Sequence, residues 1–218
     1  MSTDFRIVVL ISGRGTNLKS LIEAAQHYKI AQVISNKSAA PGLAIAAARG
    51  IPTSVITRDE YRSLDEQKEA ILEAVRSARP DLVVLAGFMQ ILPPTFVDIF
   101  QDRIVNIHPS LLPKFVGLDT HARALAAGER VHGCTAHLVD SGLDSGAIIA
   151  QAAVRVDAND TAESLGAKVL EREHVLYPWV INAIAQGQIL TNRGNLSFSE
   201  RLITEAQMFG FSVGSPPR

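Results

Sequence analysis

The chain has almost no cysteine and no excess of either charge, and each of these absences excludes classes of protein. A single cysteine, Cys134, excludes an intrachain disulfide framework, and no Cys and His residues have zinc-finger spacing. The 21 Lys and Arg residues nearly balance the 22 Asp and Glu residues, which leaves a formal net charge of −1. This balance gives no electrostatic case for nucleic acid or an anionic membrane surface as a partner. Cys134 stands in an apolar run, which predicts a buried structural thiol.

The sequence also lacks long apolar runs and a signal-peptide pattern. No stretch approaches the roughly 18 apolar residues that a membrane span needs. Residues 1–6 lead directly into a short apolar run, so we expect a cytoplasmic protein without a membrane partner. The last residues, 214–218, have the composition of a disordered tail. With 218 residues, 47% hydrophobic and 20% charged, the chain can form one globular domain with a full core.

Strand-like and helix-like segments alternate along the first half of the chain. Near-continuous apolar runs, typical of strands covered on both faces, occupy residues 7–11, 32–35, 53–56 and 82–86. Helical patterns lie between them at 17–27, 42–49 and 61–78. The alternation predicts an α/β fold of βαβ units, with a Rossmann-like, mostly parallel sheet and flanking helices through about residue 110.

The pattern changes in the second half. The predicted elements there are a short helix at 121–127 and added strands at 135–139 and 148–156, for which an antiparallel direction is open. A long C-terminal helix is expected at 161–185, with Asp160 or Thr161 as its N-cap. Pro178 inside this helix predicts a kink or a break, because proline removes a helical hydrogen bond.

The segment 106–113 carries the strongest chemical signal. Asn106 and His108 are two residues apart on a strand-like run, so they share one face. Pro109 then ends the strand, because it has no N–H and biases His108 toward an extended conformation. An amide donor beside a titratable ring suits stabilising an oxyanion and moving a proton. An ordinary strand end with a hydrogen-bonded histidine is the alternative for this segment taken alone.

A glycine-containing turn at 12–18 follows the first strand and opens the first helix. Backbone N–H groups at a helix start favour an anion such as phosphate. Leu18 stands where the third glycine of a dinucleotide fingerprint belongs, and the second strand ends without an acidic residue for a ribose. We therefore expect a monophosphate cradle, with a tight structural turn as the alternative.

Acidic residues supply two further candidates. One carboxylate of the loop 140–146 can face His108 and favour its charged form, although Asp, Ser and Gly are also ordinary turn residues. Glu173 falls inside the apolar stripe of the long helix, so it must be paired or point into a polar cavity. The apolar segment 85–93 can line a pocket or belong to the core. His121, His132 and His137 are expected to be packing or turn residues. No His, Asp and Glu cluster has metal-ligand spacing, so we predict no metal.

Together these segments resemble the folate-dependent glycinamide ribonucleotide transformylases of the formyltransferase family. The resemblance covers about residues 6–190, through the segments 8–13, 15–18, 35–37, 86–89, 106–113, 143–146, 173–174 and 177–178. It implies a single domain over 1–218 with the formyltransferase fold. In that domain, 1–110 would be the nucleotide- and phosphate-binding half, 111–190 the folate-binding and catalytic half, and 191–218 a C-terminal extension with a flexible end.

The family resemblance also implies the reaction. The glycinamide amine of N1-(5-phospho-D-ribosyl)glycinamide would attack the formyl carbon of the co-substrate 10-formyltetrahydrofolate, in de novo purine (IMP) biosynthesis. Asn106 and protonated His108 would stabilise the tetrahedral oxyanion, and Asp144 would be the charge partner and proton shuttle. The implied nucleotide-binding residues are Gly13, Gly15, Thr16, Asn17 and Glu173. The implied folate-binding residues are Leu85, Met89, Gln90, Ile91, Leu92, Val139, Asp140 and Asp144. Small molecules are the expected partners, of a monomer or homodimer.

The chain departs from the family pattern in a few places, and other functions stay open. Gln90 replaces an arginine, Val116 a proline, and Leu170 a residue that is often polar; Asp119 also differs from relatives. A 10-formyltetrahydrofolate hydrolase usually has an extra N-terminal domain, and a methionyl-tRNA formyltransferase usually has a C-terminal RNA-binding domain. A non-catalytic folate- or nucleotide-binding protein is the third alternative. The presence of Asn106, His108 and Asp144 together argues against it.

Overall fold

The computed structural model describes residues 4–214, so residues 215–218 of the expected tail lie outside the described part. The chain forms two compact units, and the first ends at Val105 where the second begins at Asn106. Strand β5 (Ile104–His108) begins in the first unit and ends in the second.

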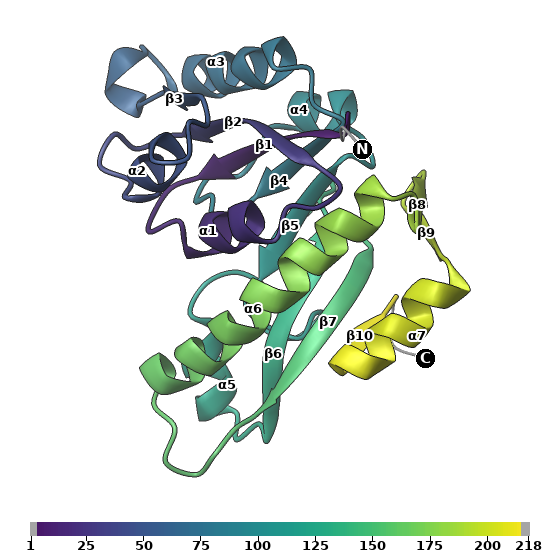
Figure 1. Cartoon of the computed structure of the whole chain (residues 1–218). Helices are drawn as coiled ribbons and strands as arrows, with labels where there is room; N and C mark the ends of the chain where they lie inside the picture. Colours follow the sequence, from purple (N-terminus) through teal and green to yellow (C-terminus); the bar gives the residue numbers. More distant parts are fainter. Residues whose placement is uncertain (1–3, 215–218) are drawn as a thin grey trace. The chain divides into compact units, whose positions relative to one another are not determined.

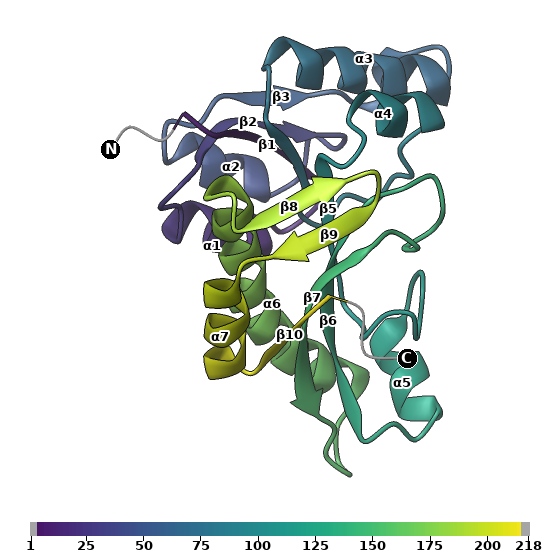
Figure 2. The ribbon, with the colours of Figure 1, turned by 90° about the vertical axis from the view of Figure 1, so that its right-hand side faces the viewer.

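The first unit is a parallel α/β sheet with helices packed on it. Its strands are β1 (Arg6–Ile11), β2 (Lys29–Ser35), β3 (Thr53–Val55) and β4 (Leu82–Leu85), in the order β4-β1-β2-β3. Its helices are α1 (Thr16–Glu23), α2 (Gly42–Ala47), α3 (Leu64–Ser77) and α4 (Pro94–Ile99), with a 3-10 turn η1 (Arg58–Glu60). Helices α1 and α2 cover one face of the strands and α3 covers the other (Figures 1 and 2). Coverage on both faces is why β4 is buried at every position.

The second unit has antiparallel strands beneath a long helix. Its strands are β6 (Val131–Leu138), β7 (Ile148–Arg155) and β10 (Phe211–Val213), and the hairpin β8 (Ile189–Asn192) with β9 (Asn195–Phe198). Its helices are α5 (Thr120–Ala126), α6 (Ala162–Ala185) and α7 (Glu200–Phe209). Helix α6 packs along β6 and β7, and β10 adds to the outer edge of β7. The sequence left open the direction of the strands expected at 135–139 and 148–156; the structure shows that β6 and β7 run antiparallel.

Helix α6 begins as predicted but is not broken at its proline. Thr161 is the N-cap, and its hydroxyl accepts a hydrogen bond from Ser164 N in a capping box. A kink or a break was predicted at Pro178; the break is wrong, because the helix continues for seven residues to Ala185. An interior proline costs about 3 kcal/mol. Burial of apolar side chains such as Leu176 and Tyr177, each contributing about 1.5–3 kcal/mol, offsets that cost.

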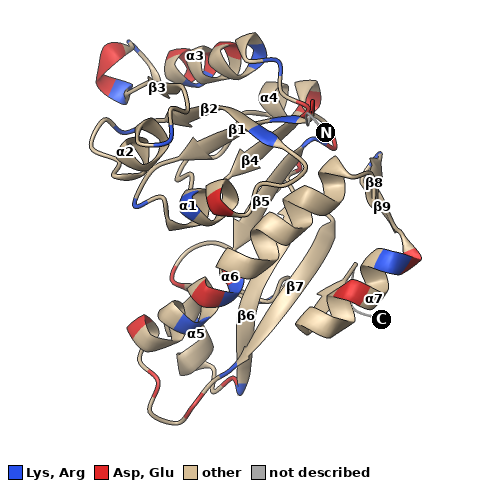
Figure 3. Ribbon diagram, viewed as in Figure 1, with Lys and Arg blue, Asp and Glu red and all other residues tan. Residues whose placement is uncertain are grey.

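The predicted α/β class is confirmed, with a mostly parallel sheet, flanking helices, later strands and a long helix. Helices α4 and α7, the β8–β9 hairpin and β10 were not predicted. Among residues 4–214, no helix combines the length and apolarity that a bilayer span requires. Acidic and basic residues both occur on helices such as α3 (Figure 3).

Candidate active site

The candidate site is built around the end of β5. Ile104, Val105 and Ile107 are buried and anchor this strand in the core, and Asn106 and His108 share one of its faces. Ile107 is 7% exposed and His108 is 5% exposed, so the ring is held in a fixed environment. As the sequence predicted, the strand stops at His108, directly before Pro109.

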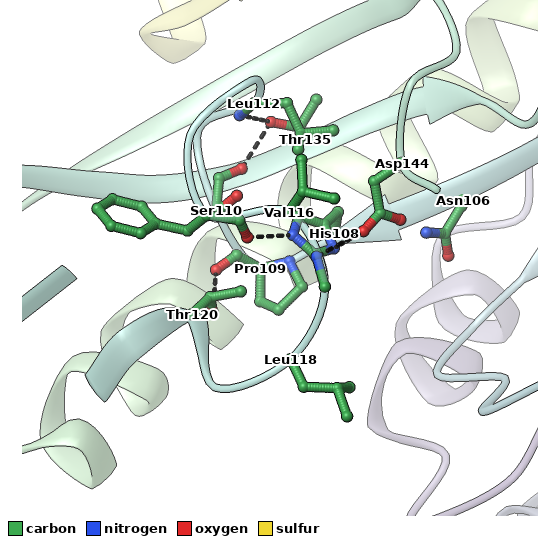
Figure 4. Close-up of polar contacts among 12 residues, drawn as sticks. Asn106, His108, Pro109, Ser110, Leu112, Val116, Leu118, Thr120, Thr135 and Asp144 are labelled. Carbon is green, nitrogen blue, oxygen red and sulfur yellow. Dashed lines mark hydrogen bonds and ion pairs between the residues drawn. The ribbon is translucent and has the colours of Figure 1, made fainter. Parts of the chain in front are cut away.

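The turn after His108 is braced by a buried hydroxyl. Thr135 on β6 donates from Oγ1 to Ser110 O at 2.6 Å, and it accepts from Leu112 N at 3.0 Å and Gln151 Nε2 at 2.8 Å. A threonine hydroxyl has one donor and two acceptor positions, so all of its bonding capacity is used. Thr120 Oγ1 adds a 2.7 Å bond to Pro109 O from the start of α5 (Figure 4). These bonds fix the direction in which the chain leaves the His108 position.

Both ring nitrogens of His108 face oxygen atoms. Nδ1 lies 3.4 Å from Asp144 Oδ2, and Nε2 lies 3.0 Å from the carbonyl oxygen of Phe115. A carbonyl can only accept, so Nε2 carries a proton; a bare Nδ1 would then direct its lone pair at a carboxylate. Figure 4 shows Asp144 and His108 facing one another, with Asn106 close to Asp144.

Asn106 is oriented by a second histidine, His137 on β6. Asn106 Nδ2 donates to His137 Nε2 at 3.1 Å, and His137 Nδ1 donates to Leu138 O at 2.8 Å. This pattern requires a neutral His137 ring. Burial lowers the pKa of His137 below 6.5, which outweighs the opposite effect of Asp144, and so keeps the ring neutral at neutral pH. Asp144 Oδ1 is 3.8 Å from His137 Nε2, so His137 lies between the amide and the carboxylate.

The loop between β6 and β7 presents Asp144 to His108. Asp140 serves the turn itself, because its Oδ1 accepts from Gly142 N at 3.0 Å and from Ser145 Oγ at 2.7 Å. Of the two loop carboxylates, Asp144 is therefore the one that faces His108. Gly146 lets the loop close, since a Cβ there would collide with the carbonyl oxygen of Leu138.

The glycine turn of the first unit has the geometry of a helix-start cradle. Gly15 is the N-cap of α1 and has a left-handed φ of 75°. A Cβ on Gly15 would approach Gly42 Cα to 2.5 Å, so only glycine permits α1 and α2 to meet here. Thr16 and Asn17 form the first turn of α1, where backbone N–H groups have no acceptor within the helix. Gly13 lies at the entrance to this turn, and its carbonyl accepts from Gly42 N at 3.2 Å.

A polar cluster lies at the carboxyl ends of the parallel strands in the same unit. Ser12, directly after β1, donates to Asn36 Oδ1 at 2.6 Å and accepts from Met89 N at 2.8 Å. Ser12 and Asn36 are both buried. They hold the start of the segment 89–91, which follows β4 at the end of the sheet where α/β folds usually bind ligands.

Comparisons with known proteins show the family of the chain. The model of the formyl transferase family matches residues 5–181. The chain belongs to the formyl transferase family.

It is 44% identical to the phosphoribosylglycinamide formyltransferase of Haemophilus influenzae over 88% of this chain and 92% of that protein. A solved phosphoribosylglycinamide formyltransferase from Coxiella burnetii superposes with a TM-score of 0.85 at 42% identity, over 89% of this chain and 93% of that one. A formyltetrahydrofolate deformylase from Pseudomonas syringae reaches a TM-score of 0.84 at 27% identity, over 91% of this chain and 67% of that one. The predicted family and the prediction of a formyltransferase enzyme are confirmed.

Within this formyltransferase, the residues predicted to bind folate belong to both units. Leu85 ends β4 and is buried, Gln90 and Leu92 are partly buried, and Met89 and Ile91 are 63% and 71% exposed. In the second unit, Val139 is partly buried after β6, Asp140 is exposed, and Asp144 is partly buried. Gln90 Nε2 donates to the buried Gln67 Oε1 at 3.1 Å, so its side chain is held by α3.

Glu173 of the formyltransferase is buried on α6, as the apolar stripe predicted. It is 6% exposed, and its charge, together with the larger effect of burial, raises the pKa of Cys134 on β6. Cys134 is itself fully buried, as expected for a structural thiol. Among residues 4–214, no group of three His, Cys, Asp or Glu side chains could hold a metal ion.

Sequence reasoning missed three residues that shape these sites. His137 was expected to be a packing residue, yet it is the hydrogen-bond partner of Asn106. Thr135 and Ser12 were given no individual role. Ser12 had a detectable signal, since it is a polar residue directly after an apolar strand. Thr135 and His137 had no such signal, because they are two of several buried positions on a long strand.

Proposed function

We propose that the enzyme transfers the formyl group of 10-formyltetrahydrofolate to the glycinamide amine of N1-(5-phospho-D-ribosyl)glycinamide. The products would be formylglycinamide ribonucleotide and tetrahydrofolate, in de novo purine biosynthesis. The observation that carries the proposal is the group at the end of β5, where His108 lies between Asp144 and the Phe115 carbonyl. The phosphoribosylglycinamide formyltransferases among its relatives support this choice of reaction.

In the proposed mechanism the amine attacks the formyl carbon directly. A nitrogen–carbon bond forms and the carbonyl oxygen becomes an oxyanion, which the Asn106 amide and protonated His108 stabilise as donors. The carbon–N10 bond then breaks. The amine loses one proton and N10 gains one, and Asp144 serves the transfer through water while keeping His108 charged. In this mechanism His108 exchanges its bond to the Phe115 carbonyl for one to the oxyanion.

We propose that the first unit binds the nucleotide phosphate. The first-turn N–H groups at Gly15, Thr16 and Asn17, approached over Gly13, suit a dianion that needs several donors. Glu173 on α6 would contact the ribose or the glycinamide amine, which a buried carboxylate can bind with good geometry.

For the folate we propose contacts with the segment 85–92 and with Val139, Asp140 and Asp144. The exposed apolar side chains of Met89 and Ile91 suit a flat aromatic ligand. No metal takes part in this proposal, and the substrates are small molecules. We place the enzyme in the cytoplasm, where purine precursors would be made, as a monomer or homodimer of one formyltransferase domain.

Hydrolysis of 10-formyltetrahydrofolate is the second candidate, because the deformylase of Pseudomonas syringae shares the fold. In that reaction water replaces the amine. An absorbance assay of tetrahydrofolate formation, run with and without glycinamide ribonucleotide, separates the two. We expect product only with the nucleotide. Equal rates without it would establish hydrolysis, and no product in either case would indicate a binding protein.

A further inference from the structure

The loop between β5 and α5 adopts a backbone that is unfavourable by itself. Phe115 has a φ of 57° and Asp119 a φ of 56°, both in the left-handed region that non-glycine residues avoid. Gly117 between them has a φ of 83°. Such a conformation persists only where surrounding contacts determine it. We call residues 115–118 the site loop.

The site loop makes hydrogen bonds with both His108 and Asp144. The Phe115 carbonyl accepts from His108 Nε2 at 3.0 Å, and Gly117 N donates to Asp144 Oδ2 at 3.0 Å. Asp144 Oδ2 is also the oxygen that lies 3.4 Å from His108 Nδ1. A shift of the loop would therefore change the donor of the carboxylate and the acceptor of the ring at once.

Arg123 on α5 holds this loop from the outside. Its Nη1 donates to Val116 O at 2.7 Å and to Leu118 O at 3.2 Å, so it binds two carbonyls on either side of Gly117. Its guanidinium carbon also lies 5.6 Å from the centre of the Phe115 ring, within cation–π range. A planar guanidinium provides several donors in a rigid arrangement, which suits two carbonyls better than an ammonium does.

We propose that Arg123 is a positioning residue of the formyltransferase reaction. It fixes the strained site loop so that Gly117 N remains on Asp144 and Phe115 O holds the His108 ring in place until the oxyanion replaces it. It touches neither substrate nor the reacting atoms, and it acts through the site loop. The inference rests on the proposed roles of His108 and Asp144.

The test compares three variants of the full chain. Arg123→Met removes the donors but keeps the aliphatic stem, and Arg123→Lys keeps the charge. The matched control is Lys114→Met, which breaks the exposed 2.7 Å ion pair with Glu129 beside the same loop. We expect Arg123→Met to lower kcat by about ten- to a hundredfold, because small misplacements of catalytic groups cost about that much. KM for the nucleotide should stay within about twofold, since its proposed contacts are elsewhere.

Two further readouts distinguish positioning from general stability. A fourth variant, Arg123→Ala, leaves room for free guanidinium. Millimolar guanidinium should restore part of its kcat, whereas it should leave Lys114→Met unchanged. Amide hydrogen exchange at Gly117 should rise by about tenfold in Arg123→Met and stay unchanged in Lys114→Met. The Arg123→Lys variant should fall between the wild-type enzyme and Arg123→Met.

Three results would overturn the inference: a wild-type kcat in Arg123→Met, equal losses in Arg123→Met and Lys114→Met, or unchanged exchange at Gly117. The exchange measurement needs no activity. A wild-type enzyme that shows no nucleotide-dependent turnover would contradict the proposed function, while the effect of Arg123 on the loop would still be decided by exchange.

Discussion

Replacing Thr135 by valine tests whether the buried brace behind His108 matters for stability and activity. The substitution keeps the shape and removes one hydroxyl that makes three hydrogen bonds, all to buried groups. Gln151 Nε2 retains its 2.9 Å bond to Leu112 O, so the two groups left unsatisfied are Ser110 O and Leu112 N. At about 1–3 kcal/mol for each, the free energy of unfolding should fall by about 2–6 kcal/mol.

The assay is urea unfolding combined with a thermal melt. For a chain of this size, 1 kcal/mol shifts Tm by about 2–4 °C, so we expect a decrease of about 4–24 °C. The matched control is Thr135→Ser, which keeps Oγ and its three bonds and should lose only a methyl group, at about 1 kcal/mol. Because the turn at Ser110 sets the direction of the chain after His108, kcat of the valine variant should fall as well. Equal stabilities for the valine and serine variants would refute the reasoning.

Two other predictions concern buried ionisable groups. Glu173→Ala should weaken nucleotide binding by about tenfold and folate binding much less, measured by calorimetry for each ligand; equal losses for both, or a large decrease in Tm, would indicate a structural role instead. Burial lowers the pKa of His132 in the folded chain to about 4. As the pH falls below about 6.5, the unfolded chain therefore binds a proton at this residue, whereas the folded chain does not. Its contribution to stability is therefore intact above about pH 6.5 and is lost as the pH falls toward 4, by about 3 kcal/mol in total, and His132→Gln should flatten the stability profile in that range.

Much of the first unit follows from local patterns in the sequence. The apolar runs before Ser12 and Asn36 are strands covered on both faces, and such strands need no knowledge of their neighbours to be recognised. The same reasoning places Asn106 and His108 on one face of β5, because the period of a strand is local. The N-cap at Thr161 is local as well.

The remaining features depend on contacts between residues far apart in the chain. The bond from Asn106 to His137 requires the relative position of two strands, which hydrophobic pattern alone does not set. Phe211 of β10 pairs with Ala152 after a separation of many residues, so the last strand has no local signal. Pro178 shows the opposite case, in which a strong local rule loses to the tertiary packing of α6. Arg123 belongs here too, since its partners are main-chain carbonyls that any residue could supply.

The central claim is that His108 and Asp144 act as one unit in formyl transfer. It is tested most directly by the nucleotide-dependent kcat of His108→Ala, Asp144→Asn and the double variant, with nucleotide affinity measured by calorimetry on each. Either substitution should lower kcat by about a hundredfold or more, the double variant should be no worse than the more damaged single variant, and nucleotide affinity should be largely unchanged. Near-normal turnover of Asp144→Asn, or losses that multiply in the double variant, would show that the two side chains do not act as one unit.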